Sequence, residues 1–287
     1  MAETGGSPGT NGSGADCVLD LMPESGIGYL TQALADIGRG LAMWRLGWAL
    51  GWVDIKLRYR GSLLGPLWLT FSTAVMVAAM GPIYGLLFHM DMRTYVPFLA
   101  VSLVLWGFVS GVANDGPTIF TGAAGLIQAA RLPFTLHALR ALVRNSLILL
   151  HNVIVIAVVF ALCGVVPAHL GGALPAVVLW GIDGLALSLL LGVVGTRFRD
   201  IPPIVSSLMT IAFFVTPVLW EARLVTVDPR FLLFNPFYAL LDIIRAPLLG
   251  APAALSSWVA ALAYSVLLWV GMLLLFARLR SRLAYWV

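Results

Sequence analysis

Charged residues are scarce in this chain of 287 residues: only 10% are Asp, Glu, Lys or Arg, whereas 60% are hydrophobic. A soluble domain carries about 25% charged residues, so the composition excludes an ordinary soluble fold and predicts a membrane protein. The ten tryptophans and 29 glycines agree with this prediction, because Trp gathers at membrane interfaces and Gly is common in membrane helices. The net charge of +4 gives no reason to expect nucleic acid as a partner.

Cysteine is also rare. Cys17 lies in a polar stretch and Cys163 in an apolar run, so neither a disulfide framework nor a metal-ligand spacing is predicted. Residues 1–16 are rich in Gly, Ser and Thr, and they lack Lys, Arg and an apolar core, so no signal peptide is expected. We predict a disordered tail over residues 1–25 and one transmembrane domain over residues 26–287.

The motifs of common enzymes are missing as well. The sequence has no GxxxxGK[ST] for binding ATP through a P-loop, and neither a GxSxG elbow nor an HExxH. The four histidines, of which His151 lies in an apolar run, are scattered along the chain, and a single intramembrane His most often makes a helix–helix hydrogen bond. A polytopic glycosyl- or acyltransferase would want acids or histidines clustered at one depth, so it is a less favoured alternative, and no metal site is predicted.

What the sequence does contain is long apolar runs. A spanning helix needs about 20 predominantly apolar residues, and six runs approach this length: residues 64–88, 96–113, 141–165, 174–195, 201–219 and 258–277. The expected fold class is therefore an all-α polytopic membrane protein with six transmembrane helices. An even number of spans places both termini on the same side.

The cations are distributed unevenly between the two sides. Of 17 Lys and Arg residues, 13 fall on the side of the termini: Arg39, Arg45, Lys56, Arg58, Arg60, Arg131, Arg140, Arg144, Arg197, Arg199, Arg278, Arg280 and Arg282. The other side holds Arg93, Arg223, Arg230 and Arg245. The positive-inside rule therefore predicts that the N- and C-termini are cytoplasmic.

Residues 29–54 form a different kind of segment, in which Trp44, Trp48 and Trp52 recur every four residues. On a helix this spacing places three indoles along one face. An amphipathic helix with Trp on one face is typical of a helix that lies in the membrane plane, and we predict such an interfacial helix. The alternative is a helix that packs against the spans by the same stripe.

The connection from residue 220 to residue 257 is too long and apolar for a plain loop. Within it, "NPFYALLDIIRAPLLG" has apolar helical spacing between prolines but carries Asp242 and Arg245. We predict a re-entrant or interfacial helix at the outer face, because irregular backbone at membrane depth must be shielded by protein or water. An outer cap that only packs remains an equal alternative.

Asp183 is the only acidic residue inside an expected span. Intramembrane acids are functional candidates by default, so a secondary transporter that uses Asp183 is another alternative. A proton relay would want a second acid or His at a matching depth, and no such residue is evident.

Aromatic residues recur in the expected spans, and most such residues face lipid or pack in the core. A stripe of rings could instead form a path for sugars, because the C–H faces of sugars stack on aromatic rings. The candidates are Trp68, Phe71, Tyr84, Phe88, Trp106, Phe108, Phe213 and Phe214.

Two short cytoplasmic connections carry charge: "QAARLPFTLHALRALVRN" and "GTRFRDIPP". Pro133 in the first suits the start of a helix. Tight, charged, exposed turns of this kind are either docking surfaces or simple topology anchors, and charge count alone favours the anchors.

Six blocks of sequence, taken together and in this order, indicate a family: "DIKLRYRGSLLGPLWLTFSTAVM", "LIQAARLPFTLHALR", "GTRFRDIPPIVSSLM", "FFVTPVLW", "NPFYALLDIIRAPLLG" and "RLRSRLAYWV". Over about residues 54–287 the chain resembles the membrane permease of polysaccharide ABC exporters, the ABC-2 type that exports O-antigen. In relatives of this kind we would expect a neutral Asn-like residue near the position of Asp183, so the resemblance leaves the role of Asp183 open.

The resemblance implies a transport subunit without enzymatic activity or a cofactor of its own, located in the bacterial inner membrane. Two permease copies, as a homodimer among membrane lipids, would pair with two copies of a separate ABC ATPase subunit that binds ATP and Mg. The substrate would be a polysaccharide linked to undecaprenyl diphosphate and moved from cytoplasm to periplasm. A permease for capsule or teichoic acid is the alternative within this class.

The resemblance also implies roles for particular residues. ATPase coupling falls to Arg131, Leu132, Pro133, Phe134, Arg197, Arg199 and Asp200. The outer gate helices cover residues 220–250, with Trp220, Asn235, Pro236, Phe237 and Tyr238. The aromatic candidates in the first, second and fifth spans would line the pore.

The cations of "WVDIKLRYRGSLLGPLW" precede a span that would line this pore. Lys56, Arg58 and Arg60 would hold the start of the span at anionic headgroups. We further hypothesise that they attract the diphosphate of the substrate at the cytoplasmic mouth; the alternative is that they only anchor the topology.

Overall fold

The computed structural model describes residues 28–62, 65, 67–130, 132–167, 169–224 and 229–287. The tail predicted over residues 1–25 and the start of the first expected span lie outside the described residues. Within the described part, the chain forms helices and no strand. The α-helices are α1 (Gly28–Ala42), α2 (Trp44–Arg58), α3 (Leu67–Leu87), α4 (Met92–Asp115), α5 (Ala124–Ala129), α6 (Phe134–Cys163), α7 (Leu170–Arg197), α8 (Ile201–Val215), α9 (Pro236–Leu248) and α10 (Leu255–Trp286).

Short 3₁₀ turns continue or connect these helices. They are η1 (Gly116–Thr118), η2 (Thr121–Ala123), η3 (Ala222–Leu224) and η4 (Pro229–Phe234). Since η1 follows α4 directly, the two form one continuous element of 27 residues, Met92–Thr118.

Five elements are long and apolar enough to cross a membrane: α3, α4 with η1, α6, α7 and α10, of 21 to 32 residues each. Five of the six expected spans are thus confirmed in length and composition. The expected span over residues 201–219 is not, because α8 has only 15 residues and extends about 22 Å at 1.5 Å per residue. It ends where Thr216 adopts an extended conformation (φ −83°, ψ 140°) before Pro217, since the residue before proline is disfavoured in the helical region.

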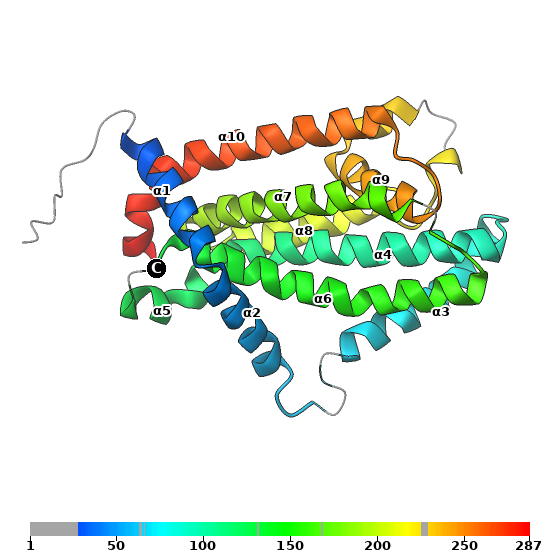
Figure 1. Ribbon diagram of the computed structural model, residues 1–287, viewed down its shortest axis with the longest axis horizontal. Helices are drawn as coiled ribbons and strands as arrows, with labels where there is room; N and C mark the ends of the chain where they lie inside the picture. The colour runs from blue at the N-terminus through cyan, green and yellow to red at the C-terminus, as the bar shows by residue number, and fades with distance from the viewer. Residues whose placement is uncertain (1–27, 63–64, 66, 131, 168, 225–228) are drawn as a thin grey trace, which may run out of the picture.

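The long helices lie side by side in a bundle (Figure 1). At one end lie α1, α5, the start of α6 and the C-terminus, and we call this the α5 end. The opposite end, which we call the α9 end, holds α9 and the turns between α3 and α4 and between α6 and α7. Of the cations predicted for the side of the termini, those on α1, at the start of α6, at the turn between α7 and α8 and at the end of α10 belong to segments at the α5 end, whereas α2, which ends with Lys56 and Arg58, runs away from it (Figure 1).

The core of the bundle forms around α4. Tyr95, Leu99 and Val101 on this helix are fully buried, whereas α3 and α10 expose large apolar side chains such as Leu86 and Leu267, with exposed fractions of 71% and 66%. Apolar faces of this size must be covered by lipid or by another protein surface. The exposure therefore agrees with the membrane class that the composition predicts.

The segment predicted as one interfacial helix forms two, α1 and α2, joined at Met43 (φ −87°, ψ 25°). The Trp stripe points away from the bundle: Trp44, Trp48 and Trp52 are 58%, 48% and 42% exposed. The alternative, in which this stripe packs against the spans, is therefore wrong for the single chain.

The face of α2 that does pack against the bundle consists of two glycines and Ile55. A Cβ on Gly47 would lie 2.9 Å from Leu139 Cδ2, and one on Gly51 would lie 2.9 Å from the carbonyl oxygen of Arg140. Glycine thus lets the backbone of α2 approach α6 closely while the indoles face outward.

Candidate functional site

At the α5 end, Asp36 of α1 joins three helices. Its side chain is 1% exposed and accepts hydrogen bonds from the backbone N of Phe134 (3.3 Å) and Thr135 (3.0 Å), from Thr135 Oγ1 (2.8 Å) and from Arg280 Nε (3.1 Å). The first N–H groups of a helix have no partner within that helix, and a carboxylate there is favoured by the helix dipole. Asp36 therefore caps α6 from another helix and connects it to α10.

A second charged cluster binds α2 to α4 and α6. Asp54 accepts hydrogen bonds from Nε of Arg140, at 2.7 Å, and from Nη2 of the same side chain. It also accepts from Nη1 of Arg144 at 3.4 Å. Arg144 also donates to Asp115 at 2.7 Å, as does Asn145 Nδ2 at 2.8 Å. Ion pairs held by several hydrogen bonds in this way fix geometry as well as charge.

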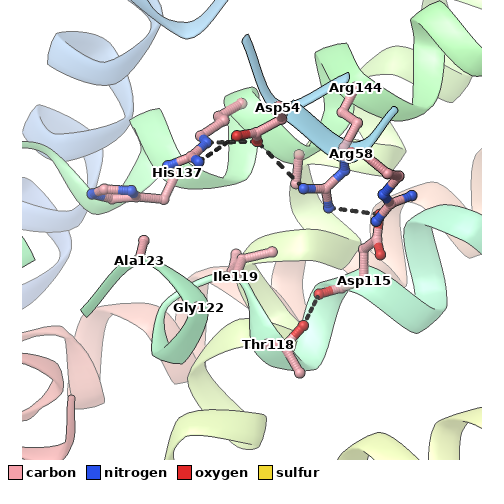
Figure 2. A pocket seen from close by; sticks show the side chains of 11 residues that line it. Asp54, Arg58, Asp115, Thr118, Ile119, Gly122, Ala123, His137 and Arg144 are labelled. Carbon is pink, nitrogen blue, oxygen red and sulfur yellow. Dashed lines mark hydrogen bonds and ion pairs between the residues drawn. The ribbon is translucent and has the colours of Figure 1, made fainter. Parts of the chain in front are cut away.

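The charged side chains of this cluster border a cavity of about 210 Å³, at which residues from α2, α4 and α6 meet (Figure 2). Arg58, His137, Thr118 and Ile119 are also in its lining. His137 is 2% exposed, and its two ring nitrogens have no hydrogen-bond partner within the described part of the chain. In the sequence neither Asp36 nor Asp54 was singled out, because each is an ordinary acid whose partners lie about 90 residues or more away.

The predicted coupling residues gather at the α5 end. Leu132, Pro133 and Phe134 are half-buried, and the ring of Phe134 meets that of Phe120 edge-on at 5.5 Å. Beside them is a groove of about 590 Å³ that is also lined by α1 and the end of α10. Arg131 lies outside the described residues.

The second predicted coupling element is the turn between α7 and α8. Arg197, Arg199 and Asp200 are exposed there, and Arg197 lies over the ring of Trp286 at 5.3 Å. The structure thus places both coupling elements at one end, and their docking to a partner stays a prediction.

The predicted diphosphate residues lie at the end of α2 and just beyond it. Lys56, Arg58 and Arg60 are exposed; Lys56 Nζ lies 5.5 Å from the Trp52 ring, and Arg58 reaches the charged cavity. Burial raises the pKa of the Tyr59 hydroxyl above its usual range, although the neighbouring Arg58 acts in the opposite direction. Contact of Lys56, Arg58 and Arg60 with a diphosphate stays a prediction.

The aromatic candidates differ in exposure and fall into three groups. Trp68, Phe71 and Phe214 are exposed, while Tyr84, Phe88 and Phe213 are half-buried.

The other two candidates, Trp106 and Phe108, are buried on α4. Trp106 contacts Phe213 and Phe237 at ring distances of 5.8 and 5.5 Å, and Phe108 stacks on Trp180 at 5.5 Å. Within one chain these two rings therefore pack against other rings, and which of the eight line a pore stays a prediction.

At the α9 end, residues 216–220 cross the interior between α8 and η3 without forming a helix. Their polar atoms find side-chain partners: Arg245 donates to the Pro217 carbonyl at 2.6 Å, and the Tyr95 hydroxyl donates to the Leu219 carbonyl at 2.6 Å. Buried backbone groups away from water require such partners. Arg245 and Tyr95 therefore hold an irregular segment in place.

Arg245 is itself 5% exposed. It also donates to Ser102 Oγ at 3.3 Å, lies 3.7 Å from the Asp242 carboxylate and sits over the ring of Phe98 at 4.8 Å. From the sequence, Arg245 was only a charge that argued against a full span, so its bond to Pro217 was missed.

Two of the residues predicted for the outer gate, Trp220 and Asn235, make hydrogen bonds around the start of α9 and the end of α8. Asn235 caps α9, since its side-chain oxygen accepts from Phe237 N at 3.0 Å and its Nδ2 donates to Thr216 Oγ1 at 2.9 Å. Pro236 occupies the first turn, where proline is favoured. Trp220 Nε1 donates to the Phe214 carbonyl at 3.2 Å, and Tyr238 is half-buried. A gating movement stays a prediction.

Asp183 on α7 is buried and accepts a hydrogen bond from Ser265 of α10. Its other oxygen has no hydrogen-bond partner within the described residues, and the residue borders a cavity of about 70 Å³. The neighbour is a hydroxyl rather than the second acid or His that a proton relay would want.

Comparison with known proteins gives relatives of one kind. No family model matches the chain. The O-antigen export system permease protein RfbA of Myxococcus xanthus is 29% identical over 201 residues, which cover 67% of this chain and 76% of that protein.

Two RfbA permeases of Klebsiella pneumoniae are 24% and 25% identical over 181 and 185 residues, each covering 60% of this chain and 67% of its own length. The resemblance that the six sequence blocks indicate is confirmed, and the five apolar helices agree with a multi-pass membrane protein.

Proposed function

We propose that this chain is the permease subunit of an ATP-driven exporter that moves undecaprenyl-diphosphate-linked polysaccharide from cytoplasm to periplasm across the bacterial inner membrane. The observation that carries the proposal is the similarity to three O-antigen export permeases over 181 to 201 residues. The sequence has no P-loop, so the energy would come from a separate ABC ATPase that binds ATP and Mg, two copies of it on a permease homodimer.

In this proposal the α5 end faces the cytoplasm, because it carries most of the cations. Since α1 and the C-terminal end of α10 lie at the same end (Figure 1), the chain must traverse the bundle an even number of times. The short helix α8 with residues 216–220 and α9 would complete the sixth crossing, which supports six spans and an outer gate built on α9.

ATP binding would close the two ATPase subunits and displace the coupling residues at the α5 end. That displacement can shift the permease only as far as the ATPase binds its two conformations with different affinity. A pore at the two-fold axis would then admit the glycan past the aromatic candidates, while Lys56, Arg58 and Arg60 attract its diphosphate.

Deletion of the gene tests the function. We expect lipid-linked glycan to accumulate on the cytoplasmic side, and inactivation of the ATPase by substitution of its P-loop lysine should give the same accumulation. If glycan assembly stops and nothing accumulates inside, the chain is an enzyme of assembly and the proposal is wrong. The chemistry of the accumulated glycan distinguishes O-antigen from capsule and teichoic acid.

A further inference from the structure

We infer that Asp36 is a positioning residue that makes the loop at Leu132–Phe134, α1 and the end of α10 move as one body when a partner displaces that loop. The inference rests on the proposed function, because it assigns a task to Asp36 within the ATP-driven movement. It is carried by the bonds that converge on one buried carboxylate.

The two oxygens of Asp36 have different partners. Oδ1 accepts from Thr135 N and Thr135 Oγ1, whereas Oδ2 accepts from Phe134 N and Arg280 Nε. Phe134 is the first residue of α6 and directly follows Pro133 of the coupling loop. Any displacement of the loop must therefore carry α1 and α10 along or break these bonds.

The packing around Asp36 leaves little room for independent movement. A Cβ on Gly40, one turn further along α1, would lie 2.6 Å from Thr135 Cβ, so the side chain of Thr135 packs directly on the backbone of α1. Arg280 also donates to Gln32 of α1 at 3.3 Å. Three helices thus meet directly at the start of α6.

The same contact surface continues along α2. Gly47 and Gly51 lie against α6, and Asp54 pairs with Arg140 of that helix. The pair α1–α2 is therefore fastened to α6 at both ends, and a movement that enters at Phe134 reaches the end of α2, next to Lys56 and Arg58.

The groove beside Asp36 gives a partner access to this loop. Its lining includes Leu132, Pro133 and Phe134 together with Asp36 and Arg280. A surface that presses on the loop there acts directly on the residues that Asp36 holds.

An amide in place of the carboxylate separates the two sets of bonds. In D36N the remaining oxygen can still accept from Thr135, but the amide nitrogen is a donor and cannot accept from Phe134 N or Arg280. The variant keeps the shape and one half of the cap, and it removes the bond that joins Asp36 to α10. R280Q removes the same connection from the other side, and R280K restores a cation for it.

The test uses the complete permease–ATPase complex in proteoliposomes loaded with lipid-linked glycan, with ATP hydrolysis and glycan export measured in the same vesicles. In D36N and R280Q we expect the glycan exported per ATP hydrolysed to fall roughly tenfold, the size of a typical coupling between two sites. R280K should recover most of the export. R282Q, which neutralises an exposed arginine on the same helix end, should leave the ratio unchanged.

The outcomes are distinguishable. If D36N and R280Q lower hydrolysis and export in proportion, or leave their ratio at the wild-type value, Asp36 is only structural and the inference is wrong. Should either variant assemble poorly, T135V, which removes one hydroxyl bond only, must still lower the ratio. If the wild-type complex exports no glycan with ATP, the proposed function itself fails.

Discussion

The two ends of the bundle each bury one charged side chain, but they use it differently. At the α5 end, Asp36 accepts bonds from the start of a regular helix and from Arg280. At the α9 end, Arg245 donates to the carbonyl of Pro217 in a segment that is not helical. Asp36 therefore joins regular helices to one another. Arg245 instead supplies a hydrogen bond to a backbone carbonyl in a segment without regular secondary structure.

This difference predicts different costs. The side chain of Arg280, which pairs with Asp36, is 21% exposed, so water can replace part of what Asp36 provides. The side chain of Arg245 is only 6% exposed, and its partner Pro217 is buried as well. Loss of a charge at the α9 end should therefore destabilise the protein more than loss of one at the α5 end.

The largest effect is expected for R245L. It leaves the Pro217 carbonyl and the Asp242 carboxylate without their cation, and breaking a buried ion pair from one side costs about 3–5 kcal/mol. The free energy of unfolding of the purified permease in detergent measures this loss. R223L is the control at the same end, because Arg223 is 66% exposed and pairs with Glu221, and it should change stability by less than about 1 kcal/mol. Equal losses in the two variants would contradict the comparison.

At the α5 end, D36A should cost about 2 kcal/mol, from about 1 kcal/mol for the lost cap and up to about 1 kcal/mol for the partly exposed ion pair. The same unfolding measurement applies. D200A is its control, because Asp200 stands at the N-cap of α8 without a side-chain capping bond and should change little. A cost for D36A above that of R245L would reverse the proposed order of the two ends.

At the α9 end, the hydroxyl of Tyr95 allows the hydrogen bonding of residues 216–220 to be tested without changing a charge. Y95F removes the bond to the Leu219 carbonyl and leaves a buried acceptor unsatisfied, which should cost about 1–2 kcal/mol. Y84F is the matched change on α3, where the half-buried Tyr84 hydroxyl makes no hydrogen bond within the described residues. Similar unfolding energies for the two variants would show that residues 216–220 do not depend on Tyr95.

Features of the fold and the site that depend on neighbouring residues could be predicted from the sequence, whereas contacts between residues far apart in the chain could not. The apolar runs and the spacing of Trp44, Trp48 and Trp52 are local, so five spans and a stripe of three indoles on one helix face could be predicted. The bond from Asp36 to Thr135 joins residues 99 apart, and that from Tyr95 to Leu219 joins residues 124 apart. No local pattern marks either acid or hydroxyl as buried.

Two boundaries were predicted wrongly for different reasons. The early end of α8 had a signal in Thr216-Pro217, since the residue before proline leaves the helical region, but the apolar run continued past it. The break at Met43 has neither proline nor glycine at that position. It follows from the way α1 and α2 each pack on α6, through Gly40 and through Gly47 with Gly51.

The smallest effect is expected where the comparison rests on packing alone. G51A places a Cβ 2.9 Å from the Arg140 carbonyl oxygen and 2.9 Å from Val143 Cγ1, and overpacking of this kind costs about 1–3 kcal/mol. The gain of about 0.5–1 kcal/mol from replacing a helical glycine offsets part of it, which leaves a net loss of about 1 kcal/mol.

G38A measures the gain from replacing a helical glycine without any overpacking, because nothing lies within 4 Å of a Cβ at Gly38. It should stabilise the protein by about 0.5–1 kcal/mol. The two alanines lie on adjacent helices and should therefore shift the free energy of unfolding in opposite directions. Stabilisation by both would mean that α2 does not press on α6 at Gly51.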